Sequence, residues 1–243
     1  MRLHWLGHVP FEDAANIGAW AEQHGCTVTN TQLYTGAPLP RIEEIDALAV
    51  MGGPMNVYQH RDHPWLLQEK RFLEQAIRAG IPTIGVCLGA QLVADVLGAR
   101  VVQNPHIEIG WFEVETVTES AGAEPNDHPP LLPDLPTRFM AFHWHGDTFE
   151  IPRGAIRIAQ SRACRNQAFE YSGHVLGLQF HLEYSAQSIE KMLAHCGHEL
   201  VQAPFVQDRE RITQGLANLS MSRELLDSVL DSLLGHVASN GAS

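Results

Sequence analysis

The chain has 243 residues, of which 44% are hydrophobic, and a formal net charge of −12 at pH 7. This length and apolar content suit one large α/β domain with an appendage. Only 16 residues are Lys or Arg, and they form no cluster, which argues against a nucleic acid partner. The N-terminus lacks a signal-peptide pattern and no apolar run approaches membrane-spanning length, so we expect a soluble, cytoplasmic protein without a membrane partner.

Strand and helix signals alternate over the first hundred residues. The pattern predicts strands at 2–8, 27–29, 47–51 and 82–86, and helices at 13–24 (with Asp13 as N-cap), 65–79 and 91–97. Such alternation is typical of a parallel sheet that is covered by helices on both faces. Functional loops are then expected at the carboxyl ends of the strands.

Short extended runs dominate the next eighty residues, which indicates a more antiparallel second half. These runs lie at 100–103, 111–118, 138–143, 156–160, 168–171 and 175–180. A segment rich in Pro, Asp and Glu at 119–136 predicts a surface loop. Helices are expected at 185–195, 208–218 and 222–237.

Cys87 lies between two glycines where the strand at 82–86 meets a helix. Small flanking residues permit the strained strand-to-helix turn known as a nucleophile elbow. The following helix directs unpaired N–H groups towards the sulfur and favours its thiolate form. We therefore interpret Cys87 as a nucleophile, although a buried apolar cysteine is the simpler alternative. The four cysteines are widely spaced, which predicts neither a zinc site nor disulfides.

His181 and Glu183 follow the apolar run at 175–180. They stand two positions apart, so both side chains would point to one face if the strand continued. A cysteine nucleophile needs a general base, and that base needs a third group to orient it. Cys87, His181 and Glu183 together supply these three roles.

Two backbone N–H groups are candidates for stabilising the tetrahedral oxygen of such a reaction. Gly53 follows the strand at 47–51 and lacks a Cβ that would hinder close approach, and Leu88 directly follows the nucleophile. The alternative for Gly52 and Gly53 is an ordinary turn after a strand. Their position beside Cys87 in this fold favours the oxyanion role.

Four blocks of the chain resemble class I glutamine amidotransferases of the triad type, and within them the amidotransferase domain of GMP synthase and its stand-alone relatives. The blocks are Met51–Pro54, Gly85–Gln91, His145–Asp147 and Gln179–Glu183. Each block is weakly informative alone, but their order and spacing are specific together. The family usually has proline between the histidine and the glutamate, where this chain has Leu182; that residue makes no chemical contribution of its own.

The resemblance implies a flavodoxin-like, three-layer α/β fold whose mixed, mainly parallel sheet carries helices on both faces. It assigns residues 1–190 to a class I glutamine amidotransferase domain, which leaves residues 191–243 as a helical C-terminal extension. This extension would pack on the domain or form a homo-oligomer contact. For binding glutamine, the resemblance implicates the side chain of Gln91 and backbone groups of His145, Gly146 and Asp147.

A metal hydrolase is a separate hypothesis, raised by the sequence from His143 to Asp147. Two histidines at i and i+2 of a strand, followed by an aspartate, can face one metal ion. No further ligand cluster is evident in the sequence, and the cysteine triad accounts for hydrolysis without a metal. We therefore expect neither a metal nor another cofactor.

The substrate is expected to be glutamine or another small γ-glutamyl compound. No Walker A motif is present, so the use of any released ammonia stays open. One hypothesis is a glutaminase-type amidotransferase that serves a separate synthetase subunit, and another is a stand-alone γ-glutamyl peptidase. A redox-sensing or binding protein of the same fold is disfavoured, because a sensor needs no His–Glu pair at this place.

Overall fold

The computed structural model describes residues 1–120, 131 and 135–240. Most of the loop predicted at 119–136 therefore lies outside the described residues. The described strands are β1 (Arg2–Gly7), β2 (Thr27–Gln32), β3 (Ala47–Val50), β4 (Thr83–Val86), β5 (Val101–Ser120), β6 (Arg138–Phe149), β7 (Ala155–Ser161), β8 (Ala168–Tyr171) and β9 (Val175–Leu178).

These strands form one sheet in the order β2-β1-β3-β4-β9-β8-β7-β5-β6. Pairing is parallel from β2 through β1, β3 and β4 to β9, and antiparallel from β9 to β6. The predicted α/β fold with a mixed sheet is thus confirmed. In the parallel half, the carboxyl ends of β1, β3, β4 and β9 meet along one edge of the sheet.

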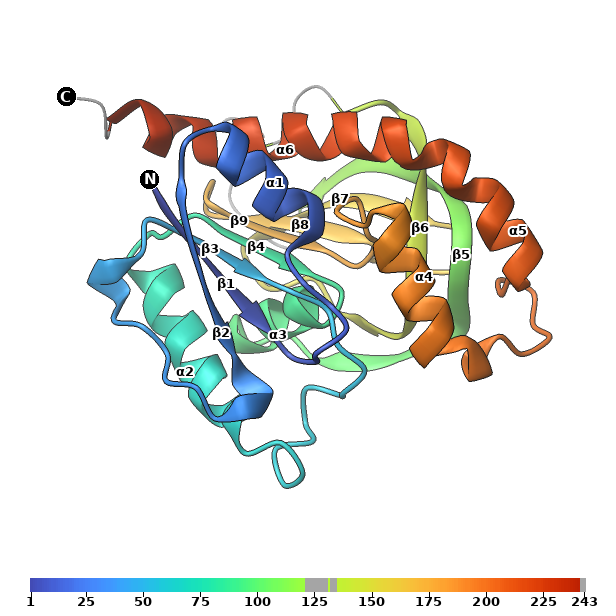
Figure 1. The fold of residues 1–243 in the computed structure, drawn as a ribbon, viewed down its shortest axis with the longest axis horizontal. Coiled ribbons are helices and arrows are strands. Elements are labelled where there is room, and N and C mark those ends of the chain that lie inside the picture. The colour runs from blue at the N-terminus through green and yellow to red at the C-terminus, as the bar shows by residue number, and fades with distance from the viewer. Residues whose placement is uncertain (121–130, 132–134, 241–243) are drawn as a thin grey trace.

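Helices cover both faces of the sheet and make three layers (Figure 1). The helices are α1 (Ala15–Gln23), α2 (Trp65–Arg78), α3 (Leu88–Val96), α4 (Ala186–His195), α5 (Arg209–Gln214) and α6 (Leu219–Asn240). Successive strand residues point to opposite faces, so Leu48 packs with α2 and α3 whereas Ala49 packs with α1 and α6. Helix α2 forms because its apolar residues recur at helical spacing, and Leu66, Phe72, Leu73, Ala76 and Ile77 are buried.

The last helix, α6, packs on the face of the sheet that α1 also covers (Figure 1). Its buried residues Leu226, Val229 and Leu230 join the core there, and Trp20 of α1 donates a 2.9 Å hydrogen bond to Asp231. Helix α4 runs across residue 190, where the sequence places the end of the amidotransferase domain. The division of the chain at that residue stays a prediction.

Several expected strand bounds are corrected by the structure. The runs predicted at 100–103 and 111–118 belong to one strand, β5, which pairs on one side with β6 and on the other with β7. A register shift between Gln103 and Glu108 accommodates Pro105 within this strand. Strand β6 extends six residues beyond its expected end at 143, to Phe149, and β9 ends at Leu178 rather than 180.

The helix starts differ from expectation as well. Ala14, not Asp13, is the N-cap of α1, and the Asp13 carboxylate accepts a 3.0 Å hydrogen bond from the N–H of Ala15 instead. Helix α3 begins at Leu88, directly after the elbow, rather than at residue 91. The tight turn leaves no room for a longer connection between strand and helix.

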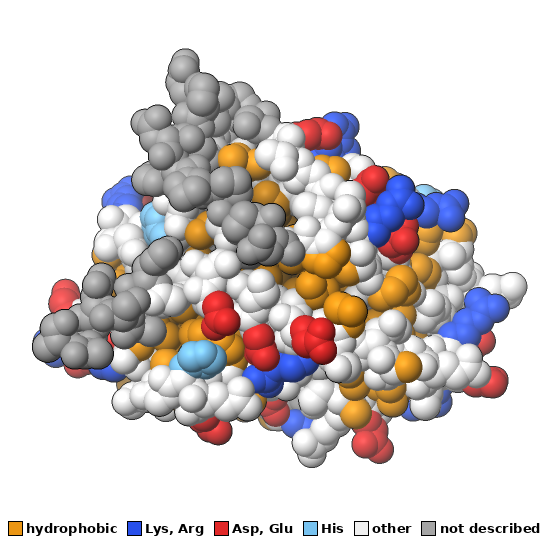
Figure 2. Space-filling model, turned by 90° about the horizontal axis from the view of Figure 1, so that it is seen from above, with side chains coloured by type: hydrophobic (Ala, Val, Ile, Leu, Met, Phe, Trp, Pro, Cys, Tyr) orange, Lys and Arg blue, Asp and Glu red, His pale blue; other side chains and the backbone are white. Residues whose placement is uncertain are grey.

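The described surface agrees with the composition. Figure 2 shows a face on which Lys and Arg side chains stand singly or beside acidic ones. A surface that tracks phosphates needs these side chains in a cluster. Among the described helices, none combines enough length and apolar character to cross a membrane.

Candidate active site

Cys87 occupies the sharp connection between β4 and α3. Its φ of 53° lies on the left-handed side of the map, and its N–H donates a 2.7 Å hydrogen bond to the carbonyl of Leu178 in β9. The flanking glycines allow this turn because a Cβ at Gly85 would come within 2.6 Å of the Gly89 backbone. A Cβ at Gly89 would overlap the carbonyl of Val50. The predicted elbow is therefore present.

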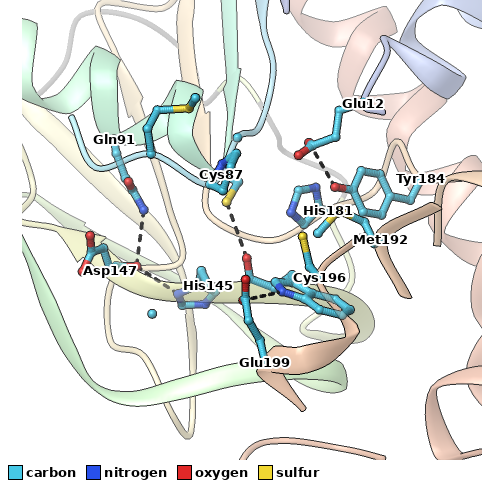
Figure 3. Close-up of a pocket in the computed structure, with 15 residues that line it drawn as sticks. Glu12, Cys87, Gln91, His145, Asp147, His181, Tyr184, Met192, Cys196 and Glu199 are labelled. Carbon is cyan, nitrogen blue, oxygen red and sulfur yellow. Dashed lines mark hydrogen bonds between the residues drawn. The ribbon is translucent and has the colours of Figure 1, made fainter. Parts of the chain in front are cut away.

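The Cys87 sulfur points into a pocket beside His181 (Figure 3). The thiol lies 3.8 Å from the carbonyl of Trp144, to which it can donate, and it accepts from the side-chain amide of Gln179 at 3.6 Å. Only 7% of the residue is exposed. A substrate must therefore enter this pocket to reach the sulfur.

His181 is held in place by its neighbours in the chain. Its Nδ1 lies 2.6 Å from a carboxylate oxygen of Glu183, its ring stacks on Tyr184 with centroids 4.2 Å apart, and its N–H donates to the carbonyl of Phe142 at 2.8 Å. Burial alone would lower the pKa of His181. The Glu183 carboxylate and the hydrogen bond with Cys87 outweigh burial and raise that pKa well above its ordinary value.

Glu183 reaches His181 although β9 ends before either residue. The expected continuous strand is absent there, and His181 instead makes an isolated bridge with Phe142 of β6. The adjacent β6 strand thus fixes the direction of the His181 backbone. The two side chains are close, as predicted, but the cause is the irregular segment after β9 and not strand alternation.

The two predicted oxyanion donors flank the nucleophile. Gly53 lines the pocket, and Leu88 is the first residue of α3. Within the part of the chain that the structure describes, neither N–H donates a hydrogen bond. A Cβ at Gly53 would come within 2.8 Å of the Met55 sulfur and 2.9 Å of the His8 Cβ, so the loop approaches the site closely only because glycine is there.

The predicted glutamine-binding loop lies within β6, and Figure 3 shows His145 and Asp147 across Cys87 from His181. The Gln91 amide donates to Gln179 at 3.1 Å and lies 3.4 Å from the carbonyl of Asp147. The His145 ring also bonds that carbonyl, through Nδ1 at 3.0 Å. The Asp147 carboxylate accepts from Asn56 at 2.7 Å, so its side chain is already engaged.

Seven of the nine predicted site residues line one pocket of about 130 Å³: Gly53, Cys87, Gln91, His145, Gly146, Asp147 and His181. The other two support it from behind, Glu183 through His181 and Leu88 as the residue after the nucleophile. The structure therefore brings together every residue that the sequence selected. Their chemical roles stay predictions.

Eight further residues line this pocket and were not selected as site residues from the sequence: Glu12, Pro54, Met55, Trp144, Tyr184, Met192, Cys196 and Glu199. Tyr184 donates a 3.1 Å hydrogen bond to Glu12, whose pKa is raised chiefly by burial. Glu12 follows β1 at the carboxyl edge of the sheet, and that position was the available signal. Met192, Cys196 and Glu199 come from α4 and the turn after it, and no local pattern marks them.

Buried ionisable groups lie just behind the pocket at Glu108, His143 and His145. Their ligand atoms fall within 4.8 Å of one another, so these described residues are close enough to hold a metal ion. The Glu108 carboxylate already accepts hydrogen bonds from Ser161 at 2.9 Å and Gln167 at 2.6 Å. The Asp147 side chain of the metal hypothesis does not join this cluster.

Glu108 and His143 of this cluster differ in their charge at neutral pH. Burial would raise the pKa of Glu108, but His143 and His145 and the Ser161 hydroxyl outweigh it and lower that pKa to about 2. Burial lowers the pKa of His143 to about 4. At neutral pH, Glu108 is therefore a carboxylate and His143 a neutral imidazole. Glu108 also holds His145, whose Nε2 lies 3.2 Å from its carboxylate.

The known proteins that resemble this chain are consistent with the chemistry that the site indicates. The family profile described as glutamine amidotransferase class-I matches residues 15–200. The glutamine amidotransferase-like protein YfeJ of Salmonella typhimurium is 35% identical over 207 residues, which cover 84% of each chain. A glutamine-hydrolysing GMP synthase of Thermomicrobium roseum is 29% identical over 77% of this chain, but that match spans only 35% of the synthase.

A solved structure is similar to this chain over almost its whole length. The crystal structure of a glutamine amidotransferase from Thermotoga maritima superposes with a TM-score of 0.84 and 30% sequence identity. The match covers 96% of this chain and 98% of that one. Together with the family profile and the 35% identity to YfeJ, this places the chain in the class-I glutamine amidotransferase family.

Proposed function

We propose that this chain hydrolyses the side-chain amide of glutamine, or of another γ-glutamyl compound, through a thioester on Cys87. The observation that carries the proposal is the position of Cys87 in one pocket with His181, whose Nδ1 Glu183 fixes at 2.6 Å. Family membership supports amide hydrolysis in general. The thioester and the roles below are our proposal.

In the first half of the reaction, the Cys87 sulfur attacks the amide carbonyl carbon. The N–H groups of Gly53 and Leu88 stabilise the negative charge that forms on the oxygen. His181 then gives a proton to the nitrogen, the C–N bond breaks, and ammonia or an amine leaves. The raised pKa of His181 suits this donation, because the ring holds its proton at neutral pH.

In the second half, a water molecule replaces the departed amine. His181 accepts a proton from this water, whose oxygen attacks the thioester carbon. A second tetrahedral intermediate collapses, the C–S bond breaks, and the electron pair returns to sulfur. The products are the γ-carboxylate, as in glutamate, and the regenerated Cys87–His181 pair.

The purified chain should release ammonia or amine from a γ-glutamyl amide or peptide without ATP, in buffer that contains EDTA. Such turnover would support a stand-alone γ-glutamyl hydrolase. Loss of activity on chelation, with recovery by zinc, would instead favour the metal hypothesis at Glu108, His143 and His145.

A trans-acting subunit is the second candidate, favoured by the similarity to the GMP synthase of Thermomicrobium roseum. In that case the chain would deliver ammonia to a separate synthetase. Turnover of glutamine by the chain alone would then be negligible and would rise on addition of cell extract containing the partner. The two candidates share the same chemistry at Cys87 and differ in what completes the site.

A further inference from the structure

His8 is an ionisable side chain that the proposed reaction does not use, and it lies directly behind the Gly52–Gly53 loop. It follows β1, and its side chain is fully buried. Its Nδ1 lies 2.8 Å from the carbonyl oxygen of Gly52. Its Nε2 lies 2.8 Å from a carboxylate oxygen of Glu69, which is also fully buried.

The geometry specifies the protonation state of His8. A carbonyl and a carboxylate are both acceptors, so each ring nitrogen must carry a proton to make both bonds. Burial would lower the pKa of His8, but the pairing with Glu69 and the bond to Gly52 outweigh it and raise that pKa. In the protonated ring both nitrogens donate, Nδ1 to the Gly52 carbonyl and Nε2 to Glu69.

Helix α2 holds this imidazolium from two positions. Trp65 stacks on the ring with centroids 5.6 Å apart, and Glu69, one helical turn later, binds its Nε2. The second Glu69 oxygen is buried and, among the described residues, has no hydrogen-bond partner. Replacing a buried ion pair by apolar side chains is often neutral or stabilising, so packing alone does not explain why one is kept here.

The bond from His8 acts on the group that the proposed reaction needs. The Gly52 carbonyl and the Gly53 N–H belong to one planar peptide unit, so fixing the direction of one fixes the other. Two consecutive glycines would otherwise leave this unit unusually free to rotate. The side chains of Met55 and Leu88 also pack closely against the loop, because a Cβ at Gly53 would come within 2.8 and 3.0 Å of them.

We propose that His8, anchored by Glu69, is a positioning residue that fixes the Gly52–Gly53 peptide so that its N–H faces the oxyanion position. The inference rests on the proposed function, because it assigns the role of the oxyanion donor to Gly53. It also deepens that function. A loop that the chain orients from within needs no partner subunit to form the oxyanion site.

Two substitutions separate the two bonds of His8. In His8→Asn, the side-chain amide nitrogen can take the place of Nδ1 and keep the bond to Gly52. In His8→Gln, the amide reaches towards Glu69 and the donor to Gly52 is lost. Removing one oxyanion donor typically costs about 10²–10³-fold in kcat, so we expect His8→Gln to lose about 10²-fold with little change in KM, and His8→Asn to retain most of kcat.

The rate at which iodoacetamide alkylates Cys87 distinguishes a positioning role from a general disturbance of the fold. A disturbed fold would change this rate as well as turnover. That displacement at carbon forms no tetrahedral oxyanion, so its rate should be the same in His8→Gln and wild type. The matched control is His4→Gln, which alters another buried histidine of the same segment, bonded to Thr29 and Thr31 outside the pocket. Wild-type kcat in His8→Gln, or a parallel loss of turnover and alkylation, would overturn the proposal.

A crystal structure with a γ-glutamyl aldehyde, which forms a tetrahedral adduct with a thiol, decides the matter even if His8→Gln does not fold. The Gly53 nitrogen should lie about 2.7–3.1 Å from the adduct oxygen while the Gly52 carbonyl stays on His8. A Gly52 carbonyl that leaves His8 in the adduct would contradict the inference. If wild type hydrolyses no γ-glutamyl amide, the proposed function fails. The positioning role can still be tested in crystals of His8→Gln: a rotated Gly52 carbonyl would support it, and an unchanged one would contradict it.

Discussion

The backbone of Cys87 is strained in the turn that directs its side chain into the pocket. A φ of 53° with ψ of −108° is rare for a residue with a Cβ, and such conformations cost on the order of 1–3 kcal/mol. The 2.7 Å hydrogen bond from its N–H to Leu178 helps to hold the turn. Strained residues of this kind cluster at functional sites, where the surrounding structure maintains them.

Labelling by a glutamine-mimicking electrophile should select Cys87 among the four cysteines. Burial raises the pKa of Cys164 and of Cys196 to about 11, so both are poor nucleophiles at neutral pH although Cys196 also lines the pocket. Peptide mass spectrometry identifies the modified residue. The Ser variants of Cys26, Cys164 and Cys196 serve as controls and should keep most of the turnover, and a label on any of these three instead of Cys87 would refute the assignment.

Removing the base should cost more than neutralising its partner. We expect His181→Ala to lower kcat/KM by about two to four orders of magnitude, the usual contribution of a general base. Glu183→Gln should cost less, because an amide can still bond Nδ1. Since the Glu183 carboxylate raises the pKa of His181, its loss should also move the alkaline limb of the pH–rate profile to lower pH. An unchanged kcat/KM in His181→Ala would point to another base, such as His143 or His145.

The elbow depends on how closely β4, α3 and β3 approach one another. Gly89 lies in the first turn of α3, against the carbonyl of Val50 at the end of β3, and any Cβ would overlap that carbonyl. Gly85 in turn meets the backbone of Gly89. The two glycines therefore serve the packing of the elements that carry Cys87 as well as the turn itself.

Gly89→Ala should destabilise the fold by about 1–3 kcal/mol or more, because overpacking here meets backbone that has little room to move. Gly18→Ala in α1 is the matched control. A Cβ there lies 3.6 Å from Ala14, an ordinary contact, and alanine favours a helix by up to about 1 kcal/mol over glycine. Denaturant unfolding of both variants checks the difference, and equal stabilities would contradict the close approach at Gly89.

Sequence periodicity predicted the bounds of elements with a clear local pattern. It failed where pairing with segments distant in the sequence determines the structure. Strand β8 was predicted at its observed bounds, Ala168–Tyr171, and the turn residues Ser172 and Gly173 follow it. Strand β5 was predicted as two separate extended runs, and pairing with β6 and β7 makes one strand of them. His181 and Glu183 were selected correctly as neighbours, but the reason given, a continuing strand, was wrong.

At the scale of the whole molecule, the site is assembled at the carboxyl edge of the parallel strands. Glu12, Gly53, Cys87 and His181 follow β1, β3, β4 and β9, respectively. Parallel topology predicts that these loops meet, which is why sequence alone could gather most of the pocket. Glu199 and its neighbours after α4 reach the pocket through tertiary packing of the chain, which leaves no trace in local patterns.

Acid should destabilise the molecule partly through its buried neutral histidines. Burial lowers the pKa of His4 to about 4, so between pH 4 and 6.5 the unfolded chain binds a proton there that the native state does not. Stability from this group is complete above pH 6.5 and falls as the pH is lowered towards 4. His8 and His181 have raised pKa values and act in the opposite sense, losing stability as the pH rises above 6.5.

The variant His4→Gln isolates the first effect. Its unfolding free energy should depend less steeply on pH between 4 and 6.5 than that of wild type, because one proton-binding site of the unfolded chain is gone. Urea unfolding at several pH values measures the two slopes. Identical slopes would show that His4 binds protons equally in both states.

The central claim is that amide hydrolysis passes through a thioester on Cys87. The most direct test is to quench the purified chain with acid during turnover of a saturating γ-glutamyl amide, without ATP, and to map the adduct by peptide mass spectrometry. Our account predicts a γ-glutamyl group on the Cys87 peptide of wild type, and neither adduct nor turnover in Cys87→Ala. Amide hydrolysis that survives Cys87→Ala, or a γ-glutamyl adduct on any other residue, would contradict it.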